Sequence, residues 1–79
     1  MDKVLHFKIF CLENYKAAHN LTGKAAYDIF QKYQVFNYIS EYFDILHSYG
    51  SLYLINDIDE FILNREKKAE TYNPANPAP

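Results

Sequence analysis

The 79-residue sequence has little of what catalysis, secretion or membrane insertion requires. Its single cysteine excludes an internal disulfide framework, and neither of its two glycines belongs to a phosphate-binding loop or a nucleophile elbow. No apolar run approaches the roughly 20 residues of a membrane span, and the Met1-Asp2-Lys3 start does not have the layout of a signal peptide. We therefore expect a cytoplasmic protein without a membrane segment.

An excess of charge of one sign is also missing. The formal net charge of −2 provides no bulk attraction to nucleic acid or to an anionic membrane. The charge is divided along the chain, since residues 1–34 carry +2 and residues 35–79 carry −4. A chain this short hides only about 60% of its unfolded surface, which leaves little room for a deep catalytic cleft. We expect no cofactor and no enzymatic activity.

Apolar periodicity predicts an all-α fold, a small bundle of about four helices in a single domain over residues 1–68. The first helix runs roughly from Asp2 to His19, and its main apolar strip includes Cys11. A second strip, formed by Leu5, Ile9 and Leu12, lies about a quarter-turn away. A helix with two apolar strips either packs against two neighbours or presents one face to a partner. Phe10 projects away from both strips, so we expect it to be exposed.

The next two helices have recognisable starts and ends. Thr22 is placed to cap a helix over residues 23–33. The third helix spans residues 35–49, and Gly50 follows it as a left-handed cap. The inward residues of this third helix are Phe36, Ile39, Tyr42, Phe43 and Leu46.

A short extended segment, Ser51–Ile55, is predicted between the third and fourth helices because its aromatic and aliphatic residues favour an extended backbone. With no second strand in the chain, this segment either pairs with another molecule, giving a homo-oligomer, or lies across the helices. Asn56 then caps the fourth helix. Residues 69–79, which include all three prolines, are predicted to form a disordered tail.

The acidic, histidine and cysteine residues are better explained by structure than by chemistry. Asp57, Asp59 and Glu60 resemble a cation site, but they are also the carboxylates that a helix start favours, and they lack a glycine-containing ligand loop. The histidines have no zinc-binding spacing. Cys11 lies on the core strip, where a buried thiol is the ordinary outcome. We expect no metal site and no catalytic residue.

The second and third helices, followed by an extended run, also resemble a helix-turn-helix with a rudimentary wing. A recognition helix needs Arg, Lys, Asn or Gln side chains, and residues 35–49 contain Glu41, Asp44 and only one preferred base reader, Asn37. A DNA-binding transcriptional regulator is therefore the alternative hypothesis rather than the leading one.

Aromatic residues are the most distinctive feature, since 18% of the chain is Tyr or Phe and eight residues are tyrosines. Several of these rings fall off the inward strips. They are either ordinary half-exposed aromatics or a protein-binding surface. The leading hypothesis is a non-enzymatic interaction module that binds another protein through Phe10, Tyr38, Tyr49 and Tyr53.

Four segments of the chain resemble, in order, a family of short bacterial proteins of unknown function found mostly in gut anaerobes of the Firmicutes. They are Phe10–Tyr15, Leu21–Ala25, Tyr33–Ile39 and Asp57–Ile62. The resemblance covers about residues 4–65. Some members lie beside genes for ADP-ribosyltransferase-like proteins, which implies an antitoxin-like or accessory role with a toxin-like enzyme as partner. The resemblance supplies no catalytic or ligand residues.

Overall fold

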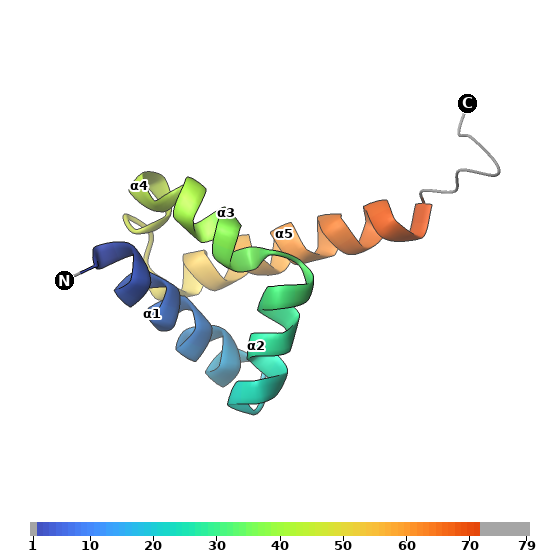
Figure 1. Ribbon diagram of the computed structural model, residues 1–79, viewed down its shortest axis with the longest axis horizontal. Helices are drawn as coiled ribbons and strands as arrows, with labels where there is room; N and C mark the ends of the chain where they lie inside the picture. The colour runs from blue at the N-terminus through green and yellow to red at the C-terminus, as the bar shows by residue number, and fades with distance from the viewer. Residues whose placement is uncertain (1, 72–79) are drawn as a thin grey trace.

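The computed structural model describes residues 2–71, with side chains placed for residues 2–68. The described residues form five helices (Figure 1). They are α1 (Lys3–Ala18), α2 (Gly23–Lys32), α3 (Val35–Glu41), α4 (Phe43–Leu46) and α5 (Ser51–Thr71). The predicted all-α fold is confirmed. None of these helices is both long enough and apolar enough to cross a membrane.

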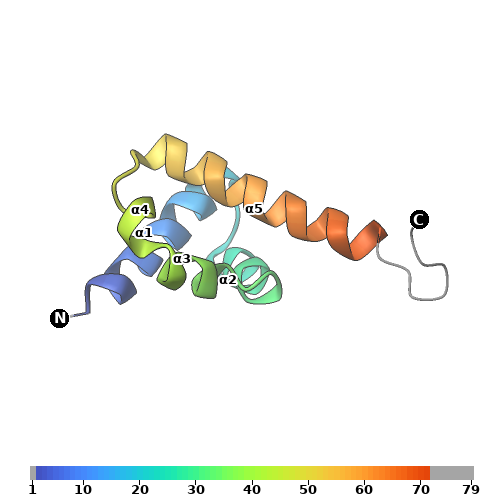
Figure 2. The ribbon, with the colours of Figure 1, turned by 90° about the horizontal axis from the view of Figure 1, so that it is seen from above.

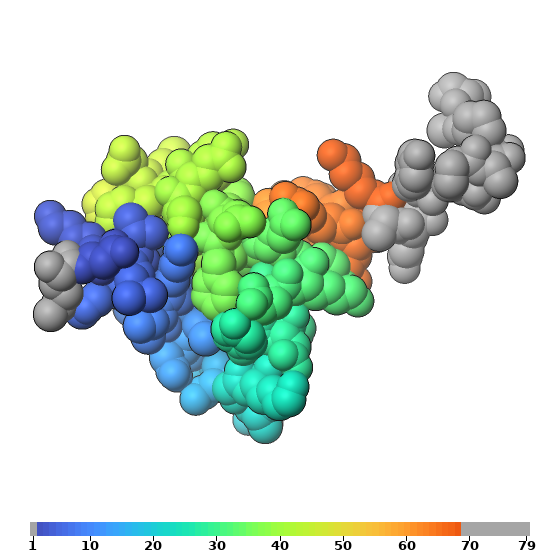
Figure 3. All heavy atoms as spheres, in the orientation of Figure 1, coloured from blue at the N-terminus to red at the C-terminus, as the bar shows by residue number. Residues whose placement is uncertain are grey.

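The five helices are arranged with α5 along one side of the other four (Figure 2). The C-terminal part of α5 projects beyond the body of the domain (Figure 3). Every helix contributes to one core, which contains Cys11, Tyr15, Ala26, Phe30, Val35, Ile39, Leu46, Leu54, Ile55, Ile58 and Ile62. Among the described residues no polar or charged side chain is fully buried, so apolar burial holds the helices together.

The first two helices begin where the sequence indicates. The Asp2 carboxylate accepts hydrogen bonds from the backbone N–H groups of Val4 and Leu5, at 3.0 and 3.3 Å. Thr22 Oγ1 accepts one from the N–H of Ala25 at 3.1 Å, which confirms the predicted cap. Each side chain satisfies donors that the first turn of a helix leaves without an intrahelical partner.

The third predicted helix differs from the structure in two respects. Residues 35–49 form two helices instead of one, because the backbone leaves helical geometry at Tyr42, with φ −110° and ψ 25°. Gly50 does not have a positive φ, so it is not a left-handed cap. The left-handed positions are Asn20 (φ 53°) and Gln34 (φ 57°), which make the turns before α2 and α3.

The predicted extended segment is wrong, because Ser51–Ile55 is the start of α5. Leu54 and Ile55 are buried in the same core as Ile58 and Ile62, and this packing outweighs the local preference for an extended backbone. The segment therefore offers no strand edge through which two copies could pair, and the wing of the helix-turn-helix alternative is absent. Asn56 lies inside α5 rather than at its N-terminus.

At its C-terminal end α5 includes residues 69–71, the first three residues of the predicted tail. The rest of that tail, residues 72–79, lies outside the described residues.

Candidate functional site: a tyrosine-lined groove

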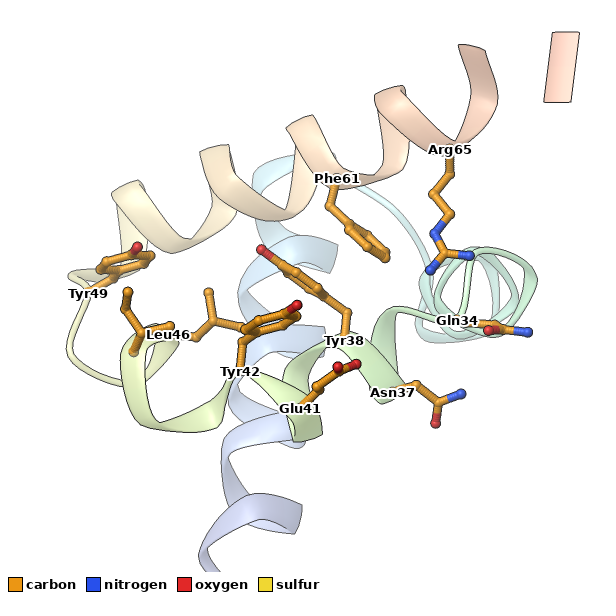
Figure 4. Close-up of a pocket in the computed structure, with 10 residues that line it drawn as sticks. Gln34, Asn37, Tyr38, Glu41, Tyr42, Leu46, Tyr49, Phe61 and Arg65 are labelled. Atoms are coloured by element: carbon orange, nitrogen blue, oxygen red, sulfur yellow. The ribbon is translucent and has the colours of Figure 1, made fainter. Parts of the chain in front are cut away.

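A groove of about 620 Å³ separates α3 and α4 from α5 (Figure 4). Its lining is formed by Gln34, Asn37, Tyr38, Glu41, Tyr42, Ile45, Leu46, Tyr49, Phe61 and Arg65. We call this surface the tyrosine groove. Three of its ten lining residues are tyrosines, and its two walls come from segments that are far apart in the sequence.

The floor of the groove is a stack of side chains held in place by a short hydrogen bond. The Tyr38 ring lies parallel to the Phe61 ring, with centroids 4.0 Å apart and planes at 16°. The Tyr38 hydroxyl donates to Asp57 Oδ2 at 2.6 Å. The Arg65 guanidinium lies 4.8 Å from the Phe61 centroid, within the range of a cation–π contact. These contacts fix Tyr38 against α5.

The environment of the Tyr38 hydroxyl keeps it protonated. Burial raises the pKa of Tyr38 well above its usual value of 10, and the hydrogen bond to Asp57 raises this pKa further. The hydroxyl is therefore a neutral donor throughout the physiological pH range. Its proton is directed to Asp57, so its role in the groove is to position the ring.

The walls of the groove remain open to solvent. Tyr42, whose ring centroid lies 5.3 Å from that of Tyr38, is 48% exposed, and Ile45 is 55% exposed. The Tyr49 ring packs on Tyr53 with centroids 4.8 Å apart, and these two residues lead into a neighbouring hollow of about 300 Å³. Exposed aromatic and aliphatic side chains thus continue from Tyr42 to Tyr53 along one side of the molecule.

Polar groups gather at the other end of the groove. Figure 4 shows Arg65 extending from α5 toward the wall that carries Gln34 and Asn37, while Glu41 lies farther along α3. The two side-chain amides can donate to and accept from a peptide backbone. Arg65 and Glu41 provide one charge of each sign. Such a surface suits a segment of another protein that combines apolar side chains with polar backbone groups.

The structure brings together three of the four predicted contact residues. Tyr38 and Tyr49 line the groove, and Tyr53 packs on Tyr49 at its edge. Phe10 is 46% exposed, as expected, but it packs near Phe7 on α1 and does not line the groove. The four residues therefore do not form one surface.

Eight of the ten groove residues were not among the predicted contacts, including Tyr42, Phe61 and Arg65. Tyr42 was expected on the inward face of its helix, but the structure leaves it 48% exposed. A signal for the α3–α4 wall was present, because Tyr38, Tyr42, Ile45 and Tyr49 follow each other at steps of four, three and four. Nothing in the sequence indicated that α5 forms the opposite wall.

Two of the three acidic residues at the predicted start of the fourth helix, Asp57 and Asp59, form tertiary hydrogen bonds and lie inside α5 rather than at its start. Asp57 accepts from Tyr38, and Asp59 is bonded to His19 Nε2 at 2.8 Å, which ties the end of α1 to α5. Within residues 2–68, no three His, Cys, Asp or Glu side chains form a cluster that could hold a metal ion. Cys11 is buried, and this burial raises the pKa of its thiol to about 12.

The fold and this surface define a small all-helical domain with an aromatic groove between α3–α4 and α5. The family model described as "Protein of unknown function (DUF3791)" matches residues 6–65. The chain belongs to this family, and all of the groove residues lie within the matched segment. No curated protein and no solved structure matches the chain.

Proposed function

We propose that the protein is a non-enzymatic interaction module that binds a segment of another protein in the tyrosine groove. The observation that carries this proposal is the pairing of a fixed floor with open walls. Tyr38 is held by its stacking on Phe61 and its bond to Asp57, while Tyr42 and Tyr53 are 48% and 66% exposed. A surface organised in advance loses less conformational entropy when a partner binds.

The composition of the groove supports a protein as the ligand. Tyrosine and arginine are enriched among the residues that dominate protein–protein binding energies, because they combine a large apolar area with a polar group. The tyrosine groove contains both residue types, together with amide side chains that suit a peptide backbone. The partner expected from the family resemblance is a toxin-like enzyme, which the module would inhibit by covering part of its surface.

The test is affinity purification of the tagged full chain from its native host at modest salt, followed by mass spectrometry. The wild-type chain is compared with a Tyr42→Ala/Tyr53→Ala variant, which removes exposed rings without opening the core. Leu63→Ala is the matched control, because Leu63 is 49% exposed and does not line the groove. A separate Phe10→Ala variant tests the predicted contact on α1.

We expect a stoichiometric partner with the wild-type chain and with Leu63→Ala. Loss of a residue that dominates an interface typically costs at least ~2 kcal/mol, so the double variant should bind at least about 30-fold more weakly. If the double variant retains its partner as well as the control does, the groove is not the binding site. If the wild-type chain is recovered alone, the proposed function is wrong.

A further inference from the structure

The chain carries, outside the described residues, a sequence that matches the chemistry of the tyrosine groove. Residues 72–79 contain all three prolines of the chain, Pro74, Pro77 and Pro79, and no charged residue. Pro74 and Pro77 have the spacing of a PxxP motif. Proline-rich segments of this kind favour the polyproline II helix and dock in grooves that are lined by aromatic side chains. Without charged side chains, such a segment can cover tyrosine rings without burying a charge.

One end of the groove lies close to the point at which residues 72–79 leave α5. Figure 4 shows Tyr49 at one end of the groove and Arg65 at the other, with Tyr38 and Phe61 between them. The helix α5 forms one wall and continues beyond Arg65 to its last residue, position 71. At 1.5 Å per residue, this continuation extends the helix by about 9 Å beyond the groove.

We propose that residues 72–79 fold back antiparallel to α5 and occupy the Arg65 end of the tyrosine groove of the same chain. The Asn73-Pro74 step supports the reversal of direction, because an Asn-Pro dipeptide favours the start of a turn. The inference rests on the proposed function, since it takes the tyrosine groove as a binding surface for a protein segment.

The segment is long enough for this arrangement. Residues 74–79 span about 19 Å at 3.1 Å per residue of polyproline II helix. About 9 Å of this length returns the chain to the level of Arg65, which leaves about 10 Å inside the groove. Phe61 lies one helical turn farther along the same wall, at about 6 Å. Pro77 and Pro79 therefore reach the Arg65 and Phe61 side chains.

Docking within one chain makes weak binding sufficient. A short flexible tether gives the segment an effective concentration of about 1 mM, so an intrinsic dissociation constant of about 1 mM keeps the groove occupied for half of the time. A protein partner then competes with the segment and binds about twofold more weakly than it would bind an open groove. The full chain therefore still captures a tight partner.

Paramagnetic broadening in the full chain tests where the segment lies. An Ala78→Cys variant carries a nitroxide label, and the native Cys11 does not compete because it is buried and the pKa of its thiol is raised to about 12. We expect the label to broaden the backbone amide resonances of Asn37 and Phe61 in the groove. Broadening should be weaker at Lys24, which lies at the opposite end of α2 from the groove.

A mixed sample separates one chain from two. When the nitroxide label and the nitrogen isotope are on different chains, only the docking of one copy's segment on another copy can broaden the groove resonances. We expect no broadening in this sample, because the contact lies within one chain.

Matched variants of the labelled chain test the contacts. Pro77→Ala/Pro79→Ala removes both rings, and a tenfold weaker intrinsic affinity lowers the docked fraction from about one half to about one tenth, so broadening should fall about fivefold. Tyr42→Ala, which removes an exposed ring of the groove, should change the broadening in the same direction. Ala75→Ser retains every proline and Leu63→Ala lies outside the groove, so both controls should broaden as the parent does. All variants should retain the same helical circular dichroism spectrum.

Three results would overturn the proposal. They are broadening no stronger in the groove than at Lys24, equal broadening in Pro77→Ala/Pro79→Ala and Ala75→Ser, and broadening that is as strong in the mixed sample. Partner capture is a separate outcome. If the segment stays away from the groove while the wild-type chain captures a partner, only this inference fails, whereas docking of the segment in a chain that captures no partner leaves only the proposed function wrong.

Discussion

The hydrogen bond between Tyr38 and Asp57 can be removed without disturbing the ring stack above it. Tyr38→Phe deletes only the hydroxyl that donates to Asp57 Oδ2 at 2.6 Å and leaves the ring on Phe61. Hydrogen bonds to charged groups contribute about 1.5–3 kcal/mol. Because this bond is only part-buried, we expect a loss near the low end, about 1–2 kcal/mol in the free energy of unfolding.

Thermal and chemical unfolding measure this loss. In a domain of this size 1 kcal/mol corresponds to roughly 4–8 °C in Tm, so Tyr38→Phe should lower Tm by at least about 4 °C. Tyr42→Phe is the control, because Tyr42 neighbours Tyr38 but is 48% exposed. This variant should change the free energy of unfolding by less than about 0.5 kcal/mol. In a double-mutant cycle, the unfolding free energies of Tyr38→Phe, Asp57→Ala and the combined variant are compared with that of the wild-type chain. The interaction energy obtained in this way should account for most of the loss caused by Tyr38→Phe.

The pH dependence provides an independent signature of the same bond. The fold raises the pKa of Tyr38, so it favours the protonated phenol. This contribution to stability is complete below the unfolded pKa of about 10, and it declines at higher pH as tyrosine in the unfolded chain ionises. Burial also raises the pKa of Tyr15. Tyr15 is present in the wild-type chain and in Tyr38→Phe, so it lowers the stability of both at high pH in the same way. The advantage of wild type over Tyr38→Phe should stay constant from about pH 7 to 9 and shrink above about pH 10.

Two results would refute this reasoning. One is a Tyr38→Phe variant as stable as wild type at neutral pH, since the hydroxyl would then contribute nothing to the floor. The other is a stability difference that does not change between about pH 9 and 11, because the phenol would then ionise equally in the folded and unfolded chains.

Three further changes test other parts of the structure. Asn56→Ala should leave the free energy of unfolding unchanged or raise it by up to about 0.5 kcal/mol, because Asn56 lies inside α5. Chemical denaturation checks this, and a loss of about 1 kcal/mol would instead indicate that Asn56 is an N-cap. Leu46→Ala should cost about 2–5 kcal/mol in the same assay because Leu46 is buried, while the neighbouring exposed Ile45→Ala should cost under about 0.5 kcal/mol. Near pH 8 the buried Cys11 thiol should react with a disulfide reagent only as fast as the folded chain opens, so denaturant should accelerate the labelling. Rapid labelling of the folded chain would contradict the burial of this thiol.

The starts of α1 and α2 could be predicted from the sequence because their signals are local. Asp2 lies directly before α1 and Thr22 directly before the amphipathic α2, and both cap a helix in the structure. The inward positions of α1 and α2, such as Cys11 and Phe30, follow from periodicity alone. Local chemistry and tertiary packing agree in these segments.

The prediction failed where local preference and packing disagree. Ser51–Ile55 has the composition of a strand, but Leu54, Ile58 and Ile62 recur at steps of four and are buried together. Placing a boundary at Asn56 divided this helical repeat in two. A helical interpretation was available from the spacing, but a single short window of aromatic and aliphatic residues does not reveal it.

The groove could be predicted only on one side. Exposure of Tyr53 follows from its position off the helical strips, and the spacing of Tyr38, Tyr42 and Tyr49 marks one wall. The opposite wall depends on the crossing of α5 over α3, which is set by how the whole core packs. No local pattern contains that information, so Phe61 and Arg65 became visible as groove residues only in the folded chain.

Two sides of α5 have different contacts, and this links the proposed binding to folding. One side of this helix supplies Leu54, Ile58 and Ile62 to the core, while Phe61 and Arg65 face the groove. The groove therefore exists only while α5 is packed, and a partner that occupies it binds the folded state alone. At a free partner concentration 100-fold above the dissociation constant, such binding adds about 2.7 kcal/mol to the free energy of unfolding. For a domain whose small size limits its own core, this is a large fraction of the total stability, so under the proposed function loss of the bound partner would lower the stability of the folded chain by the same amount.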